Sequence, residues 1–294
     1  MASPRPILAA TDLSAPARHA IERAALVSLE TAMPLHLLHV ANLAPLERLW
    51  QIMAATSDDM QQRVLDTART GLDDLSAALK KRFGVAAERH VVAGALLSEL
   101  AGKLGELEAG LLVCGAKGES VIRHLLMGTT AMRLLSTAPC PVLVVKQVPH
   151  EPYRRLLVPV DFSIWSLRAI KLAQRLAPDA EIVLLHAFAV PFEGTLRYAS
   201  VAEETISRYR VVARQEAMEK LHALRDEAGL SVRDAELIVL HGDPASRIVE
   251  QEQERDCDLI VIGKHGESVL EDLFLGSVTK HVLNESQSDV LVSV

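Results

Sequence analysis

The sequence predicts an α/β protein built from two tandem, doubly wound sandwiches, each with a five-stranded parallel sheet. Three observations lead to this prediction. The chain has 294 residues, enough for two domains of ordinary size. Its two halves repeat the same segments at a nearly constant offset. Within each half, runs of Val, Ile and Leu alternate with amphipathic stretches, which is typical of parallel strands covered by helices on both faces.

Four segments of the first half return in the second. PILAATDLS, LHLLHV, LLVCGAKGESVIRHLLMGTT and PVLVV return as LLVPVDFS, IVLLHA, LIVIGKHGESVLEDLFLGSV and DVLVS. Equivalent residues such as Asp12 and Asp161 stay 147 to 149 positions apart, which indicates a duplication. The polar, Pro-containing stretch QVPHEP suits a linker. We therefore expect domains at 1–148 and 149–294.

Each half begins with an apolar strand that ends in Asp. Ser14 or Ser163 follows shortly afterwards and is expected to cap the first helix. Long amphipathic helices are expected over about 57–82 and 200–228, because Leu, Ala and Val recur there at helical spacing. The later strands are expected at 35–40, 86–93, 111–115 and 141–145, and at 182–187, 234–240, 259–263 and 289–293. Asp243 and Pro244 predict the helix start after the third strand of the second half, and right-handed crossovers give the doubly wound order.

A Gly-x2-Gly-x9-Gly-Ser/Thr motif follows the fourth strand in both halves. Ligands of open α/β sheets bind at such carboxyl strand ends. Gly115 and Gly263 are expected to adopt φ values that other residues resist, allowing a tight exit from the strand. The last Gly and its hydroxyl residue would open a helix whose N–H groups attract an anion. We interpret the motif as a phosphate-binding loop, although plain turn glycines are the alternative. It is neither a Walker A sequence nor a Rossmann fingerprint.

These segments resemble the universal stress protein family, and the resemblance covers nearly the whole chain. It rests on TDLS and VDFS, the LLHV strand, GDPAS, the long-spaced Gly motif and the PVLVV strand. The resemblance implies an adenine nucleotide alpha hydrolase-like fold that holds ATP, ADP or AMP across the strand ends, with Mg²⁺ as a candidate companion ion. The implied binding residues are Asp161, Ala187, Ile262, Gly263, Gly266, Gly276, Ser277 and Val278, and in the first half Asp12, Val40, Gly115, Gly118, Gly128, Thr129 and Thr130.

The second half is closer to the nucleotide-binding branch of that family. It has Pro159 and GDPAS, where the first half has Ala10 and Gly94-Ala95-Leu96. The family also contains members that bind no nucleotide and tandem members with one degenerate site. We therefore expect the second site to be the working one, in a stress-response or regulatory protein.

Several residues allow two interpretations. Asp12 and Asp161 could contact ligand or merely cap the following helix. His186, His241 and His265 could join Asp161 in a metal or general-base cluster, or be ordinary strand-end residues. His36 and His39 should point to opposite faces of a strand, so a shared metal is not expected. Lys117 and Lys264 could neutralise phosphate, although lysines are usually exposed.

Composition narrows the class of protein. A formal charge of −7 without a Lys/Arg-rich run disfavours nucleic-acid binding. Three cysteines without a CxxC pair fit a reducing, cytoplasmic setting, and no apolar run suggests a signal peptide or a membrane span. No nucleophile–base pair or metal-ligand cluster is evident, so any ATP hydrolysis should be slow.

Two other classes remain as alternatives to a nucleotide sensor. They are a nucleotide-free scaffold and a slow ATPase or small-molecule enzyme that uses Asp161 and nearby histidines. PVLVV and DVLVS could also pair as edge strands, which would make an intramolecular pseudo-dimer. Association of two chains as a homodimer is the other expectation.

Overall fold

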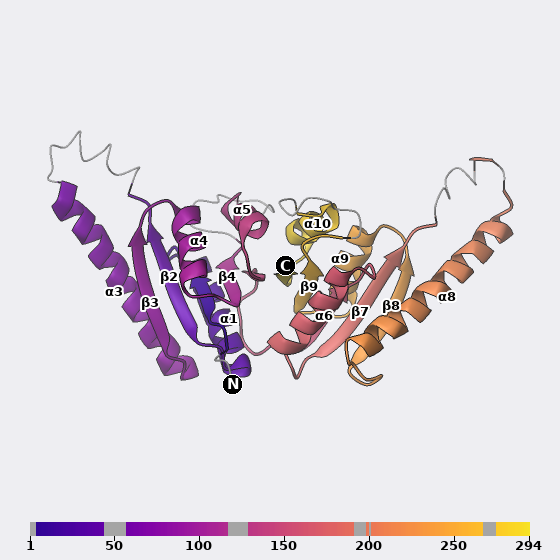
Figure 1. Cartoon of the computed structure of the whole chain (residues 1–294), viewed down its shortest axis with the longest axis horizontal. Helices are drawn as coiled ribbons and strands as arrows, with labels where there is room; N and C mark the ends of the chain where they lie inside the picture. The colour runs from indigo at the N-terminus through magenta and orange to yellow at the C-terminus, as the bar shows by residue number, and fades with distance from the viewer. Residues whose placement is uncertain (1–3, 44–56, 117–128, 191–197, 200, 267–274) are drawn as a thin grey trace. The chain divides into compact units, whose positions relative to one another are not determined.

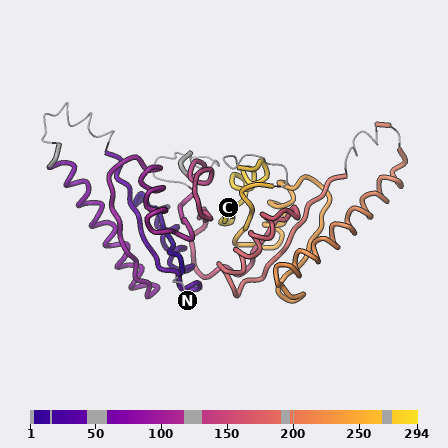
Figure 2. Tube along the Cα trace, in the orientation of Figure 1, coloured from indigo at the N-terminus to yellow at the C-terminus, as the bar shows by residue number. Residues whose placement is uncertain are grey.

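The computed structural model describes residues 4–43, 57–116, 129–190, 198–199, 201–266 and 275–294, without the side chains of 16, 57, 58, 129 and 130. The chain divides into two compact units, Met1–Pro152 and Tyr153–Val294. Figure 1 labels the elements, and Figure 2 traces the backbone in the same orientation. Both units are α/β, as predicted.

The N-terminal unit alternates strands and helices. Its elements are β1 (Ile7–Ala10), α1 (Ala15–Thr31), β2 (Leu35–Ala41), α3 (Ser57–Phe83), β3 (Ala87–Ala93), α4 (Leu96–Glu106), β4 (Leu111–Gly115), α5 (Thr129–Thr137) and β5 (Val142–Val145). The strands lie in the order β3-β2-β1-β4-β5, and each neighbouring pair is parallel. From β1 the chain first adds β2 and β3 on one side and then β4 and β5 on the other, so the direction of winding reverses beside β1, as in a doubly wound sheet.

The C-terminal unit repeats this arrangement. Its elements are β6 (Arg155–Pro159), α6 (Ile164–Leu176), β7 (Glu181–Phe188), α8 (Glu203–Glu227), β8 (Ala235–His241), α9 (Pro244–Glu254), β9 (Leu259–Gly263), α10 (Ser277–Glu285) and β10 (Asp289–Ser293). The strand order is β8-β7-β6-β9-β10, again parallel. The expected strands are confirmed in both units, and the long helices begin and end within three residues of their expected bounds. The pairing of the two last strands with each other stays a prediction.

The central strands of each sheet are buried because helices cover both faces, whereas the edge strand β3 is partly exposed. Leu8 of β1 and Leu112 of β4 are fully buried, as are Leu156 of β6 and Leu259 of β9. Figure 1 shows α3 running along β2 and β3, and α8 along β7 and β8. This coverage explains the continuous Val, Ile and Leu runs in the sequence. Within the described residues, no helix has the length and apolar character that crossing a membrane requires.

The expected helix caps hold for two helices and fail for one. The Ser14 hydroxyl accepts a hydrogen bond from the Ala17 N–H at 3.3 Å, and the Asp243 carboxylate caps α9 in front of Pro244. Ser163 stands at the N-cap position of α6, but its hydroxyl makes no cap bond to the helix. It donates instead to Oδ1 of Asp161 at 2.5 Å. The nearby carboxylate is a stronger acceptor, so the predicted capping role of this hydroxyl is wrong.

The two sheets differ where their central strands separate. In the N-terminal unit, β1 pairs with β4 over three residues, from Ile7 to Ala9. In the C-terminal unit, β6 pairs with β9 only through Leu156 and Leu157. Pro159 lies just beyond and carries no N–H for the ladder, which suits an early separation. In the C-terminal unit β6 and β9 therefore separate one residue earlier than β1 and β4 do in the N-terminal unit.

A buried polar contact holds the beginning of the C-terminal unit against its last strand. The Tyr153 hydroxyl donates to Oδ2 of Asp289 at 2.7 Å, and both residues are buried.

We expect Tyr153→Phe to lower the free energy of unfolding of this unit by about 1–3 kcal/mol, because a buried carboxylate loses a donor. Urea unfolding, followed by fluorescence, measures this free energy. The measurement uses a Trp50→Phe background, which leaves Trp165 of the C-terminal unit as the only tryptophan in the chain. Tyr209→Phe, at an exposed position, is the control, and equal effects of the two changes would contradict the expectation.

Candidate functional site

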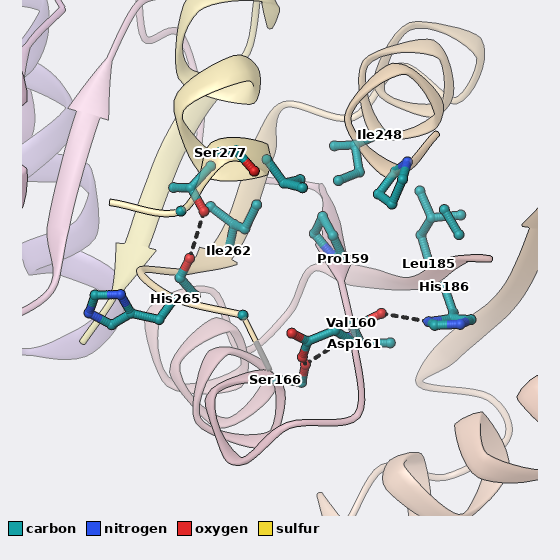
Figure 3. Close-up of a pocket in the computed structure, with 17 residues that line it drawn as sticks. Pro159, Val160, Asp161, Ser166, Leu185, His186, Ile248, Ile262, His265 and Ser277 are labelled. Atoms are coloured by element: carbon teal, nitrogen blue, oxygen red, sulfur yellow. Dashed lines mark hydrogen bonds between the residues drawn. The ribbon is translucent and has the colours of Figure 1, made fainter. Parts of the chain in front are cut away.

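A cavity of about 260 Å³ opens in the C-terminal unit where β6 and β9 separate. It lies at the carboxyl ends of β6, β7 and β9 and at the N-terminal ends of α9 and α10 (Figure 3). The residues that line it are Pro159, Val160, Asp161, Ser166, Leu185, His186, Ala187, Pro244, Ile248, Ile262, Gly263, His265, Gly266, Gly276, Ser277, Val278 and Thr279. All eight residues expected for the second site are among them.

The middle of the cavity is apolar and its ends are polar. Pro159 and Ile262 come from the two separating strands, while Leu185 and Ile248 come from β7 and α9. Figure 3 shows Asp161 and Ser166 on one side of these side chains and Ser277 on the other. Such a site suits a ligand with a flat apolar part between two hydrogen-bonding parts.

Asp161 holds the turn that leads into α6 and also borders the cavity. Its Oδ1 accepts hydrogen bonds from the Ser163 N–H at 3.1 Å, the Ser163 hydroxyl at 2.5 Å and the Ser166 hydroxyl at 2.7 Å. The Ser166 Oγ in turn accepts from the Asp161 N–H at 2.9 Å. Its Oδ1 therefore holds the residue before the helix and a side chain of the first turn but, within the described residues, accepts no backbone N–H of α6 itself. A ligand contact of Asp161, which lines the cavity, stays a prediction.

The loop after β6 is held in an uncommon backbone conformation. Phe162 has φ 67°, in the left-handed region that side chains other than glycine seldom adopt. Leu13, at the same place in the N-terminal unit, has φ 65°. The Phe162 ring lies against His186, with centroids 4.3 Å apart. The turn that presents the Asp is thus built the same way in both units.

Gly263 and Gly266 are needed for close approach and not for their φ angles. Neither has a φ in the left-handed region, so the reason predicted for Gly263 is wrong. A Cβ on Gly263 would lie 3.0 Å from the His265 carbonyl oxygen and 3.2 Å from Cβ of Trp165. A Cβ on Gly266 would lie 3.0 Å from Oδ2 of Asp161. The backbone at Gly266 therefore passes directly beside the carboxylate at the cavity wall.

The N-terminus of α10 faces the cavity without a capping side chain. Gly276 is its N-cap, and its own N–H donates to the Lys264 carbonyl at 3.0 Å. The Thr279 hydroxyl donates to the Gly263 carbonyl at 2.9 Å, which holds α10 against the end of β9. The first-turn N–H groups of a helix have no acceptor within it. They carry the positive end of the helix dipole, which favours an anion here.

The neighbouring helix α9 differs because its N-terminus already holds a carboxylate. Asp243 Oδ2 accepts from the Ser246 N–H and the Ser246 hydroxyl, each at 2.9 Å. These hydrogen bonds lower the pKa of Asp243, so its charge persists at neutral pH. The Asp243 carboxylate would repel an anionic ligand at the N-terminus of α9. An anion would therefore be favoured at the N-terminus of α10 instead.

The histidines of this unit do not form the cluster that was considered. His186 Nδ1 lies 2.8 Å from the Val160 carbonyl oxygen. Because a carbonyl only accepts, Nδ1 must carry the proton. His265 is buried edge-on to Trp165, and His241 packs against Phe188. Among the described residues, these histidines and Asp161 make no group of three converging metal ligands.

The corresponding residues of the N-terminal unit are arranged more loosely. Asp12 is exposed, and its Oδ1 accepts from the Ser14 N–H at 3.0 Å. Ala17 stands where the C-terminal unit has Ser166, so no hydroxyl can hold the carboxylate from that position. Val40 lies near the end of β2 and Gly115 ends β4. The predicted residues Gly118, Gly128 and Lys117 lie outside the described residues, and Thr129 and Thr130 open α5, with their side chains not described.

Two expectations about charged and metal-binding residues need correction. Lys264 was expected to be exposed, but it is buried and does not line the cavity. The sequence showed no metal-ligand cluster, yet His36, Glu88 and His90 place one ligand atom each within 4.8 Å of one another. The alternation Glu88-x-His90 was the available signal. The pairing that brings His36 beside it required the register of β2 against β3.

The three cysteines are buried. Burial raises the pKa of Cys114 and Cys257 to about 12 and that of Cys140 to about 11. The thiols are therefore protonated at neutral pH, which does not suit a nucleophile.

Comparison with known proteins agrees with the resemblance seen in the sequence. The sequence profile of the universal stress protein family matches residues 4–146 and again residues 152–293. A universal stress protein of Methanocaldococcus jannaschii is 35% identical over 143 residues, covering 48% of this chain and 81% of the relative. The universal stress protein YxiE of Bacillus subtilis is 30% identical over 145 residues, covering 48% and 98%. A crystal structure of a universal stress protein from Archaeoglobus fulgidus shares the fold, with a TM-score of 0.70 at 20% identity over 98% of both chains.

The cysteine pKa values lead to a direct test. With their pKa values raised by burial, we expect all three thiols of the native protein to resist iodoacetamide at pH 8, where unfolded thiols react readily. Intact-mass spectrometry measures the alkylation, and the same protein in guanidinium chloride is the positive control. Rapid modification of the native protein would show that at least one thiol is accessible and ionised.

Proposed function

The chain belongs to the universal stress protein family, and from this premise we propose that its C-terminal unit binds an adenine nucleotide, ATP in particular, as a regulatory ligand. The observation that carries the proposal is the cavity that joins the Asp161 turn, an apolar slot and the open N-terminus of α10. Each of these three parts matches one part of a nucleotide.

The apolar slot suits the base. Pro159, Leu185, Ile248 and Ile262 present hydrocarbon surface from four different elements. A purine ring buried among them would gain about 25 cal/mol for each Å² of apolar surface removed from water. The volume of about 260 Å³ is near the lower end for small-molecule sites. It has room for a base and its sugar, with the phosphates at the mouth.

Asp161 suits the sugar or the polar edge of the base. Its Oδ1 is held by three hydrogen bonds, so the carboxylate is positioned before a ligand arrives. A carboxylate accepts hydrogen bonds from hydroxyl or amine donors. Positioning by Ser163 and Ser166 would lower the entropic cost of binding.

The N-terminus of α10 suits the phosphates. Its N-cap residue is Gly276, which has no side chain to occupy the N–H groups of the first turn. Anions bind at such helix ends through free N–H groups and the helix dipole. Mg²⁺ bound with the nucleotide would neutralise phosphate charge, since this ion keeps several waters and needs few protein ligands.

Three differences between the units favour the C-terminal site. The sheet opens one residue earlier there, beside Pro159. Ser166 holds the Asp161 carboxylate, whereas Ala17 stands at that position in the N-terminal unit. Asp161 is half-buried while Asp12 is exposed. A positioned acceptor in a deeper site binds the same ligand more tightly, so we propose one strong nucleotide site for each chain.

We expect Ser277→Asp to weaken ATP binding at least about tenfold. A carboxylate in the first turn stabilises a helix, so the fold should persist while the added charge repels the phosphates. Isothermal titration calorimetry of the full chain with ATP and Mg²⁺ measures the loss. Binding of adenosine, which has no phosphate, should change little.

The matched control is Thr129→Asp, the same change at the first residue of α5. It should leave the strong site intact. Equal ATP binding by Ser277→Asp and the unmodified chain would refute the phosphate position. Loss of ATP binding in Thr129→Asp alone would place the working site in the N-terminal unit, and a chain that binds no nucleotide would favour the scaffold alternative.

A further inference from the structure

A group of metal-binding side chains lies in the N-terminal unit, away from the carboxyl edge of the sheet. His36 is the second residue of β2, and Glu88 and His90 lie two positions apart on the neighbouring edge strand β3. The register pairs His36 with Glu88 and Leu38 with His90. Residues at i and i+2 of a strand share a face. The three side chains therefore meet on one side of the sheet.

The ligand atoms of these side chains converge. Nδ1 of His36 lies 3.0 Å from Nε2 of His90 and 3.5 Å from Oε2 of Glu88. One ligand atom from each of the three residues lies within 4.8 Å of the others. A tetrahedral Zn²⁺ ion with ligands at about 2.0–2.2 Å places neighbouring ligand atoms about 3.3–3.5 Å apart. The spacing is close to what the ion needs. His36 and His90 are hydrogen-bonded to each other here, with ring planes 8° apart, so the two imidazoles as well as the exposed Glu88 side chain would have to turn to direct their lone pairs at one ion.

The fold itself does not need these histidines. By the register of β7 and β8, the C-terminal unit has Val183, Glu236 and Ile238 at the same three places. Val183 and Ile238 are buried apolar residues that pack in an equivalent sheet. Replacing such a pair with two imidazoles places polar groups where hydrocarbon suffices, which costs stability unless those groups are satisfied. At these two equivalent positions, only the N-terminal unit carries histidines, His36 and His90.

The surroundings allow an ion to enter. Glu88 is largely exposed, and His90 lines an open hollow of about 430 Å³. Arg69, Arg89 and Lys103 also line this hollow, and the two arginines are paired with Asp66 and Asp73. Lys103 is itself paired with Glu106 at 2.7 Å, which offsets its repulsion of a cation.

We propose that His36, Glu88 and His90 bind a divalent transition-metal ion, Zn²⁺ in the first instance, with water at the fourth position. Two imidazoles and one carboxylate are a donor set that zinc accepts. Oxygen-preferring ions such as Mg²⁺ should bind weakly here, because imidazole nitrogen suits zinc and its neighbours better. The site is separate from the proposed nucleotide site in sequence, in unit and in the end of the strands that it uses.

The test uses metal-free full-length protein without nucleotide. Zn²⁺ titrated by calorimetry should bind at one ion per chain, and Co²⁺ should give the visible absorption of a tetrahedral complex. The double variant His36→Val/His90→Ile installs the pair found in the C-terminal unit. It should fold, lose the Co²⁺ absorption and lose any rise in melting temperature caused by Zn²⁺.

Two single variants complete the test. Glu88→Gln keeps the shape of an exposed side chain and should weaken Zn²⁺ binding at least about tenfold. His150→Asn, at an exposed position, is the control and should leave binding unchanged. The proposal is overturned if both the double variant and Glu88→Gln bind Zn²⁺ like the unmodified chain, or if the unmodified chain binds no Zn²⁺. In either case His36 and His90 are only a hydrogen-bonded pair. If the double variant fails to fold, His90→Asn replaces it with the same expected outcome.

Discussion

The end of hydrogen bonding between β6 and β9 is the constraint on which the C-terminal site depends. Strand order reverses at this point, so the chain leaves β6 toward α6 and leaves β9 toward the Gly-rich loop. Pairing stops after Leu157 and Ile260, and Pro159 provides no N–H to extend it. The separated strand ends leave space that side chains from β7 and α9 line but do not fill. Ligand sites of open α/β sheets arise in this way because divergent loops cannot pack on each other.

The charges around the cavity are arranged by how each helix begins. The start of α6 is held by the Asp161 carboxylate and the start of α9 by that of Asp243, while α10 begins at Gly276 without a capping side chain. The Asp161 carboxylate thus lies on one side of the apolar slot and the N-terminus of α10 on the other (Figure 3). A ligand with hydroxyl or amine donors at one end and negative charge at the other is oriented by this arrangement alone.

Duplication gives two units of the same topology whose polar residues have diverged. The turn after the first strand is the same in both, down to the left-handed Leu13 and Phe162. A serine behind the carboxylate supports the proposed nucleotide site in one unit. Two histidines, one on the edge strand β3 and one on its neighbour β2, support the proposed metal site in the other. The histidines do not alter the sheet, since the β2/β3 and β7/β8 ladders have the same register. A single chain can therefore carry two kinds of site on one repeated scaffold.

The sequence by itself determined the repeat, the strands, the long helices and the glycines at the carboxyl edge, because these depend on local periodicity and spacing. Through the family resemblance, eight of the seventeen residues that line the C-terminal cavity were also predicted, whereas Ser166, Leu185 and Ile248 were found only in the structure. Tertiary structure alone decided which atoms meet. Gly263 is required by the approach of Trp165 and His265, not by its φ, and the Ser163 hydroxyl turns to Asp161. His36 reaches Glu88 and His90 only through strand register. Register and close packing join segments far apart in the chain, and no local pattern encodes the resulting distances.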